Sequence, residues 1–280
     1  MKVLKIINNN QIICTDLNGI ECIAIGKGLG FHSKIDTLVD DKKIEKIFRL
    51  ATSEITSRFQ VLVEKIPFEH IQVTDEIIQY FKASLGKELN DNIYISLTDH
   101  LNFAIERCRN NVIFSTPLLW ETKKFYHHEY TLGLYAIDHI EKQIGVKLPH
   151  EEAGFIALHI VNAQVNGVFD DTVAMTHLIQ DILNIVKYHF NMEFKEDSLD
   201  YERFLTHLRF FSQRLVKKQS YSDGDKDFIE MLRKQYPNEY SCADKIKKYI
   251  LKEYTHNMTE EETMYLVVHI NRLLNTGKNN

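Results

Sequence analysis

Short apolar runs separated by turn residues dominate the first 55 positions, which is the pattern of β-strands. The predicted strands are Val3–Ile7, Ile12–Cys14, Cys22–Ile25 and a short one near Ile44–Leu50. Asn18-Gly19 lies between the second and the third, and Asn-Gly favours the positive φ angles of a two-residue hairpin turn. We therefore predict a four-stranded antiparallel β domain. A sheet of this size buries little apolar area, so we expect it to dimerise.

From about residue 60 the hydrophobic residues recur every three or four positions, the period of amphipathic helices. The predicted helices are Asp75–Leu85, Ile93–Arg109, Leu118–Ile144, Glu151–Val165, Asp171–Phe190, Tyr201–Lys218, Asp225–Tyr236, Cys242–Tyr254 and Glu260–Leu274. Thr259 and Glu262 have the spacing of a capping box at the start of the last helix. Pro149 occupies the matching position before the helix at Glu151.

Three landmarks of the helical part recur in the same order. They pair His100-Leu-x-Phe-x-x-x-Arg107 with His207-Leu-x-Phe-x-x-x-Arg214, Tyr126-x-x-Glu129-Tyr130 with Tyr236-x-x-Glu239-Tyr240, and Glu151-Glu152-x-x-Phe155-x-x-x-His159-Ile160 with Glu261-Glu262-x-x-Tyr265-x-x-x-His269-Ile270. The offset is 107 residues for the first landmark and 110 for the others. The sequence therefore predicts a multidomain β plus all-α protein, with a β domain at 1–56 and two homologous helical bundles at 64–169 and 171–277.

The repeat also selects four of the 13 histidines, because each has an equivalent in the other copy. His100 and His207 lie at the edge of an apolar helical stripe, and His159 and His269 interrupt apolar runs. An imidazole in such a place must find a polar partner or lie at a polar seam. One interpretation is that they are core histidines whose hydrogen bonds are satisfied inside each bundle.

Two chemical interpretations compete with that structural one. A two-histidine metal site, as in metal-dependent phosphohydrolases, needs further carboxylate or histidine ligands. Asp99 adjoins His100, but its counterpart in the second copy is Thr206, so a metal explains only one copy. Alternatively, the imidazole accepts a phosphoryl group, which adds about two negative charges and several acceptor oxygens. We predict no metal, no cofactor and no enzymatic activity.

Composition indicates the class of the protein and its cellular compartment. The chain is 44% hydrophobic and 26% charged, and its four cysteines form no CxxC pair, which suits a soluble protein of the reducing cytoplasm. No apolar stretch approaches the roughly 18 residues that cross a bilayer, and the N-terminus lacks a secretory signal. The net charge of −5 argues against a broad nucleic-acid-binding surface. Residues 1–55, however, carry 8 basic and 7 acidic side chains, so the acidity belongs to the helical part.

These motifs together resemble the BglG/LicT/SacY family of transcriptional antiterminators, and the resemblance covers essentially the whole chain. The stretches that carry it are Ile7–Asn10 and Gly26–Phe31 in the β domain, and Leu97–Phe103, Glu152–Asn162 and Tyr265–Ile270 in the bundles. The resemblance implies that the first domain dimerises and clamps an antiterminator hairpin in a leader mRNA, so that the overlapping terminator cannot form. The bundles would then be regulation domains of the sugar phosphotransferase system.

The family's phosphorylated histidines map onto His100 and His159 in the first bundle and onto His207 and His269 in the second. The resemblance implies that a sugar-specific permease (enzyme II) phosphorylates the first bundle and inhibits the protein when sugar is absent. The phosphocarrier HPr would phosphorylate the second bundle and activate it. The sequence does not identify the sugar, or the histidine in each bundle that takes the phosphoryl group.

Local chemistry favours a small set of RNA-binding residues in the β domain, and it can be listed as Lys5, Asn8, Asn10, Gly26, Lys27 and Phe31. Asn8 and Asn10 are two apart and would point to one face of a strand, with their amides available to base edges. The glycines allow close backbone approach, Lys27 supplies a cation, and Phe31 can stack on a base. The family often has arginine where this chain has Lys27, which lacks the planar fork of a guanidinium.

Purely structural interpretations of these residues, and two other functions, compete with RNA binding. Asn8–Asn10 could be a plain turn and Gly26–Gly30 a flexible loop. A DNA-binding activator with the same regulatory bundles would need a helix-turn-helix at its front, where this sequence reads as strands. A metal-dependent phosphohydrolase would reveal itself by its metal content.

Overall fold

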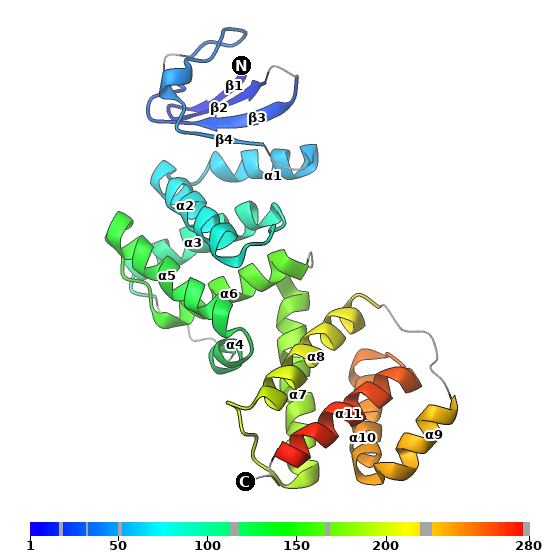
Figure 1. Ribbon diagram of the computed structural model, residues 1–280. Coiled ribbons are helices and arrows are strands. Elements are labelled where there is room, and N and C mark those ends of the chain that lie inside the picture. Colours follow the sequence, from blue (N-terminus) through cyan, green and yellow to red (C-terminus); the bar gives the residue numbers. More distant parts are fainter. Residues whose placement is uncertain are drawn as a thin grey trace. The chain divides into compact units, whose positions relative to one another are not determined.

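The computed structural model describes residues 1–16, 19–31, 33–49, 52–112, 118–165, 169–218 and 226–276 (Figure 1). Three residues of the predicted elements lie outside these ranges: Asn18 of the hairpin, Leu50 of the fourth strand and Asp225 of a helix. The chain divides into two compact units, Met1–Gly167 and Val168–Asn280. Each unit is described by itself below.

The first unit begins with the predicted four-stranded antiparallel sheet. Its strands are β1 (Lys2–Asn8), β2 (Gln11–Thr15), β3 (Glu21–Ile25) and β4 (Lys46–Phe48), and their spatial order is β1-β2-β3-β4. Asn18 of the predicted two-residue turn lies outside the described residues. Beside it, the backbone N–H of Asp16 donates to the carbonyl of Ile20, and the Asp16 carboxylate accepts the N–H of Ile20 at 3.0 Å.

The two faces of the sheet contribute to two different hydrophobic cores. Cys22 and Ala24 of β3 point into a small cluster within the sheet domain, whereas Ile23 and Ile25 join the core of the helices that follow. This is the alternation expected of a strand, where successive side chains point to opposite faces. The sheet is therefore covered by its own loops on one face and by helices on the other.

Helix α1 (Ser53–Val63) links the sheet to the first bundle and is not among the predicted helices. It begins after Thr52, whose hydroxyl oxygen accepts the N–H of Ile55 at 3.2 Å. Its Phe59 ring lies 5.0 Å from that of Phe48 on β4 and 6.4 Å from that of Tyr94 on the bundle. Helix α1 thus joins the strands and the bundle into one core, below the sheet in Figure 1.

The first bundle comprises helices α2 (Phe68–Leu85), α3 (Asn92–Arg109), α4 (Leu119–Phe125), α5 (His127–Ile144) and α6 (His150–Val165). The single helix predicted over Leu118–Ile144 is wrong, because the backbone leaves the helical region at Tyr126 (φ −128°, ψ 48°). Tyr126 is buried, as are Phe125 before it and Tyr130 after it, so the hydrophobic period continues through the break.

The second unit contains α7 (Phe169–Phe190), α8 (Leu199–Val216), α9 (Lys226–Gln235), α10 (Pro237–Tyr254) and α11 (Glu260–Thr276). Tyr236 repeats the break of Tyr126 with nearly the same angles (φ −127°, ψ 58°). Pro237 then starts α10, five residues before the predicted start at Cys242, because proline is well tolerated in the first helical turn. In the part of the chain described, no helix is long and apolar enough to cross a membrane.

Candidate functional sites

The structure brings the two repeated histidines of the first bundle together. His100 lies on α3 and His159 on α6, and their ring centroids are 4.9 Å apart. Burial, together with the neighbouring His100, lowers the pKa of His159 well below its ordinary value. His159 is therefore a neutral imidazole near pH 7, the form of histidine that has a lone pair to offer.

An ion-paired glutamate in the first turn of α6 completes this site. One Glu152 oxygen lies 3.0 Å from Nε2 of His100, without the alignment of a hydrogen bond. The other oxygen accepts a bond from the Arg107 guanidinium, two helical turns beyond His100 on α3. Burial raises the pKa of Glu152, but His100 and Arg107 outweigh it and leave the pKa below its ordinary value.

The sequence analysis overlooked Glu152 and Arg107 as site residues, although both belong to repeated landmarks. Asp99, the acid that adjoins His100 in sequence, is exposed. Among the described residues, no group of three or more histidine, cysteine, aspartate or glutamate side chains could hold a metal ion.

The second bundle repeats the histidine pair. His207 on α8 and His269 on α11 have ring centroids 4.6 Å apart, with the ring planes inclined by 23°. Burial, His269 and Arg214 lower the pKa of His207 to about 4. Burial and Arg272 also lower the pKa of His269, against the opposing effect of Asp200. This pair is therefore neutral near pH 7 and lies among cations.

The glutamate of the second bundle has different partners. Glu262 accepts the backbone N–H of Thr259 at 3.0 Å and donates its own N–H to the Thr259 hydroxyl at 3.2 Å, which confirms the predicted capping box. The same Glu262 oxygen lies 3.6 Å from Nε2 of His256. Within the described ranges, no ion pair joins Glu262 to His207. Each site contains a histidine pair, but the two carboxylates have different partners. Glu152 contacts Arg107 and His100, whereas Glu262 contacts Thr259 and His256.

Except for Lys5, the predicted RNA-binding residues lie in the glycine-rich loop and at the β1–β2 turn beside it. The N–H of Gly26 bonds the carbonyl of Asn10, and the N–H of Gly28 bonds the Asn10 side chain at 2.8 Å. A Cβ atom on Gly26 would lie 1.9 Å from the Lys43 carbonyl, and one on Gly30 would lie 1.9 Å from the Asn8 carbonyl. Glycine is required at both places because the loop packs against backbone.

Three details differ from the sequence-based picture of this loop. Asn8 and Asn10 do not share a face of one strand, because β1 ends at Asn8 and Asn10 lies in the turn, where it donates its N–H to the Asn8 side chain. Lys27 and Phe31 are exposed, the latter by 68%. Lys5 is separate from this loop and forms an ion pair with Glu64 at 2.9 Å.

Comparisons with known protein families and relatives agree with this architecture. Residues 1–57 match the CAT RNA binding domain, and residues 75–163 and 180–273 each match the PRD domain. The chain is 44% identical to the transcription antiterminator LicT of Bacillus subtilis, over 98% of this chain and 99% of that protein. It is 42% identical to the beta-glucoside operon antiterminator of Dickeya chrysanthemi, over 98% of this chain and 96% of that protein.

A solved structure resembles part of the chain. The crystal structure of GlcT CAT-PRDI covers 58% of this chain and 96% of its own, with 34% identity and a TM-score of 0.51. The match of the front of the chain to an RNA-binding domain disfavours the DNA-binding alternative. The chain belongs to the family of transcription antiterminators, regulators in which a CAT RNA-binding domain is followed by two PRD domains.

Proposed function

We propose that the protein is a sugar-responsive antiterminator that binds a hairpin in a leader mRNA and prevents terminator formation, under the control of histidine phosphorylation. The observation that carries the proposal is the recurrence of one histidine pair, at 4.9 Å and 4.6 Å between rings, in two domains that follow an RNA-binding domain. The domain bounds that we propose are 1–56, 64–169 and 171–277.

RNA recognition is assigned to the glycine-rich loop and the turn beneath it. Phe31 offers an exposed ring for stacking on an unpaired base, and Lys27 offers a cation for a phosphate. Asn10 contributes to RNA binding partly by fixing the shape of the loop, because its side chain accepts the N–H of Gly28. Lys5 is tied to Glu64, so a phosphate contact from Lys5 requires that this pair opens.

Control is assigned to His100, His159, His207 and His269. The two pairs are buried or half-buried and lie between helices, so a phosphoryl dianion there changes how those helices pack. We propose that a sugar-specific permease (enzyme II) phosphorylates the first PRD domain and that the phosphocarrier HPr phosphorylates the second. The protein acts as a homodimer, which presents two RNA-binding sheets to one hairpin.

Binding to a labelled leader hairpin tests the RNA assignment. The RNA is an imperfect hairpin that overlaps a terminator in the leader of a sugar-utilisation transcript. Phe31→Ala removes one stacking platform and should weaken binding by about 5- to 150-fold, since one base stacked on an aromatic ring contributes about 1–3 kcal/mol. Ile20→Ala is the matched control, because Ile20 is 55% exposed at the opposite end of the same strands and should bind like wild type. Equal affinities for wild type and Phe31→Ala would refute this assignment.

A further inference from the structure

Glu152 and Glu262 allow a comparison within one chain. Each is the third residue of its helix, on α6 and α11, and each side chain is 1% exposed. Glu152 is held by Arg107 and His100, whereas Glu262 is held by Thr259 and His256. The equivalents of Arg107 and His100 are present in the second domain as Arg214 and His207, so they are not what separates the two arrangements.

The difference lies in the residues before each helix. At the offset of 110, Thr259 corresponds to Pro149 and His256 corresponds to Val146. Thr259 supplies a hydroxyl and a backbone N–H to the capping box, whereas Pro149 has neither. Val146 has no polar side-chain atom to replace His256. Neither Pro149 nor Val146 therefore offers Glu152 a donor. The Glu152 carboxylate depends on His100 and Arg107 of α3.

Arg107 is also the cation best placed for a phosphoryl group on His100. It lies seven residues beyond His100 on the same helix, hence on the same face, and it already binds the carboxylate that contacts the His100 ring. A phosphoryl group carries about two negative charges and three acceptor oxygens, against one charge for a carboxylate. It is therefore the stronger competitor for the guanidinium.

We propose that the residue before α6 or α11 determines how each PRD domain responds to phosphorylation. In the first domain, a phosphoryl group on His100 takes Arg107 from Glu152 and leaves a buried carboxylate unpaired, which loosens the domain. In the second domain, Thr259 and His256 keep Glu262 paired. This inference rests on the proposed phosphorylation of the histidines. Breaking a buried pair at one side is costly because the remaining charge is uncompensated. A phosphoryl group on His207 has no such cost and gains the nearby cations.

Hydrogen exchange of the full chain tests the inference. Phosphoramidate serves as the donor: its phosphorus–nitrogen bond breaks, the imidazole nitrogen bonds to phosphorus, and ammonium leaves with the imidazole proton. Mass spectrometry locates the phosphohistidines and measures amide exchange in α6 and α11 of the same molecules. Phosphorylation of His100 should accelerate exchange in the first half of α6 at least about tenfold, because a buried unpaired charge is strongly destabilising. Exchange in α11 should stay constant or slow down when His207 is phosphorylated.

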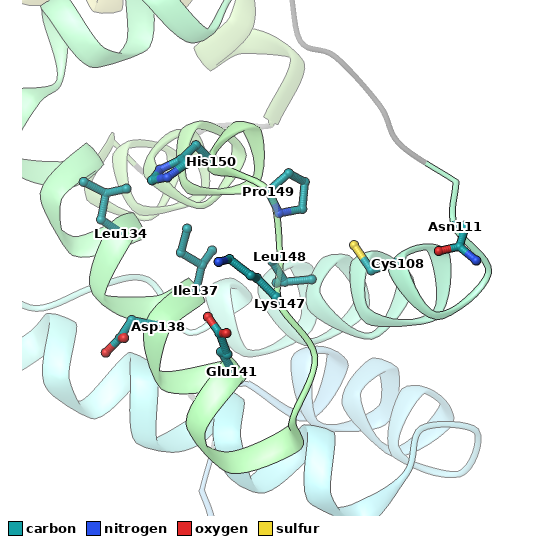
Figure 2. Close-up of a pocket in the computed structure, with 10 residues that line it drawn as sticks. All are labelled: Cys108, Asn111, Leu134, Ile137, Asp138, Glu141, Lys147, Leu148, Pro149 and His150. Carbon is teal, nitrogen blue, oxygen red and sulfur yellow. The ribbon is translucent and has the colours of Figure 1, made fainter.

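Substitutions at position 149 provide the matched series. Pro149→Thr places a threonine three residues before Glu152, the spacing of a capping box that offers this glutamate a new partner, and should abolish the acceleration in α6. Pro149 borders a cavity of about 670 Å³, which Figure 2 shows beside the start of α6, so the threonine side chain has room. Pro149→Ala restores only the N–H and should give an intermediate rate. Glu152→Gln should also abolish the acceleration, since a neutral amide tolerates the loss of Arg107.

The outcomes distinguish this inference from the proposed function on which it rests. If no histidine of either pair takes a phosphoryl group, the proposed function fails as well. If His100 is phosphorylated and exchange in α6 does not change, or changes as much in Pro149→Thr as in wild type, the inference alone is overturned. Phosphorylation at His159 without His100 would overturn it too.

Discussion

At the scale of single residues, the buried imidazole of His207 has a measurable consequence. Its pKa of about 4 means that it stays neutral from pH 7 to pH 5, where an ordinary histidine with a pKa near 6.5 becomes charged. The carbon-bound ring protons of His207, assigned by their absence in His207→Asn, should therefore keep one NMR chemical shift over this range. A titration midpoint near pH 6.5 would contradict the burial seen here.

The same lowered pKa makes the stability of the second unit depend on pH. Because the unfolded chain binds a proton at His207 below pH 6.5 and the folded chain binds it only near pH 4, the contribution to stability is full above pH 6.5. It is lost as the pH falls toward 4. Urea unfolding of the second unit should show a smaller loss of stability between pH 7 and pH 5 in His207→Asn than in wild type. Identical losses would contradict this assignment.

The glycines of the RNA-binding loop provide a second test at this scale. Gly30→Ala should displace the loop and abolish hairpin binding, because its Cβ would lie 1.9 Å from the Asn8 carbonyl. Gly28→Ala is the matched control: no atom lies within 4 Å of its Cβ, and only its positive φ of 69° opposes the change, at about 1 kcal/mol. Hairpin titrations of both variants check this, and equal effects would contradict the packing described.

At the scale of elements, α1 determines how the sheet depends on the first bundle. Phe59→Ala removes a fully buried ring between Phe48 and Tyr94 and should cost about 3–5 kcal/mol. Hydrogen exchange should then accelerate in β3 and in α3 together, with no change in α11 of the second unit. Val61→Ala on the same helix is the control, because Val61 is 57% exposed. Acceleration in only one of β3 and α3 would show that the two elements do not share a core.

The regular elements and the repeat are predictable from the sequence because they depend on periodicity and on matching landmarks. The break at Tyr126 is not, because the hydrophobic period continues through it. Helix α1 was overlooked because it begins within a region whose earlier part reads as strands. Among the candidate site residues, the four histidines follow from the repeat. The contact of Glu152 with His100 does not, since the equivalent residues Glu262 and His207 are present in the second copy without such a contact.

At the scale of the whole molecule, acidity and RNA binding reside in different parts of the chain. Residues 1–55 carry a net charge of +1, which leaves −6 for the rest. A nearly neutral RNA-binding domain gains affinity from a few well-positioned side chains and from shape complementarity, and less from the release of many counterions. Hairpin binding should therefore weaken with salt less steeply than for a protein that neutralises many phosphates. A slope of log affinity against log salt near about −10 would contradict this.

The central claim is that charge at the histidine pairs controls antitermination, and in vitro transcription across the leader terminator tests it most directly. The variant His207→Asp/His269→Asp adds negative charge at the second pair and should raise readthrough above that of the unphosphorylated wild type, in the absence of HPr. His177→Asp, at an exposed histidine with no counterpart in the repeat, should behave like wild type. Readthrough by the double variant that is equal to or below that of wild type would contradict the account.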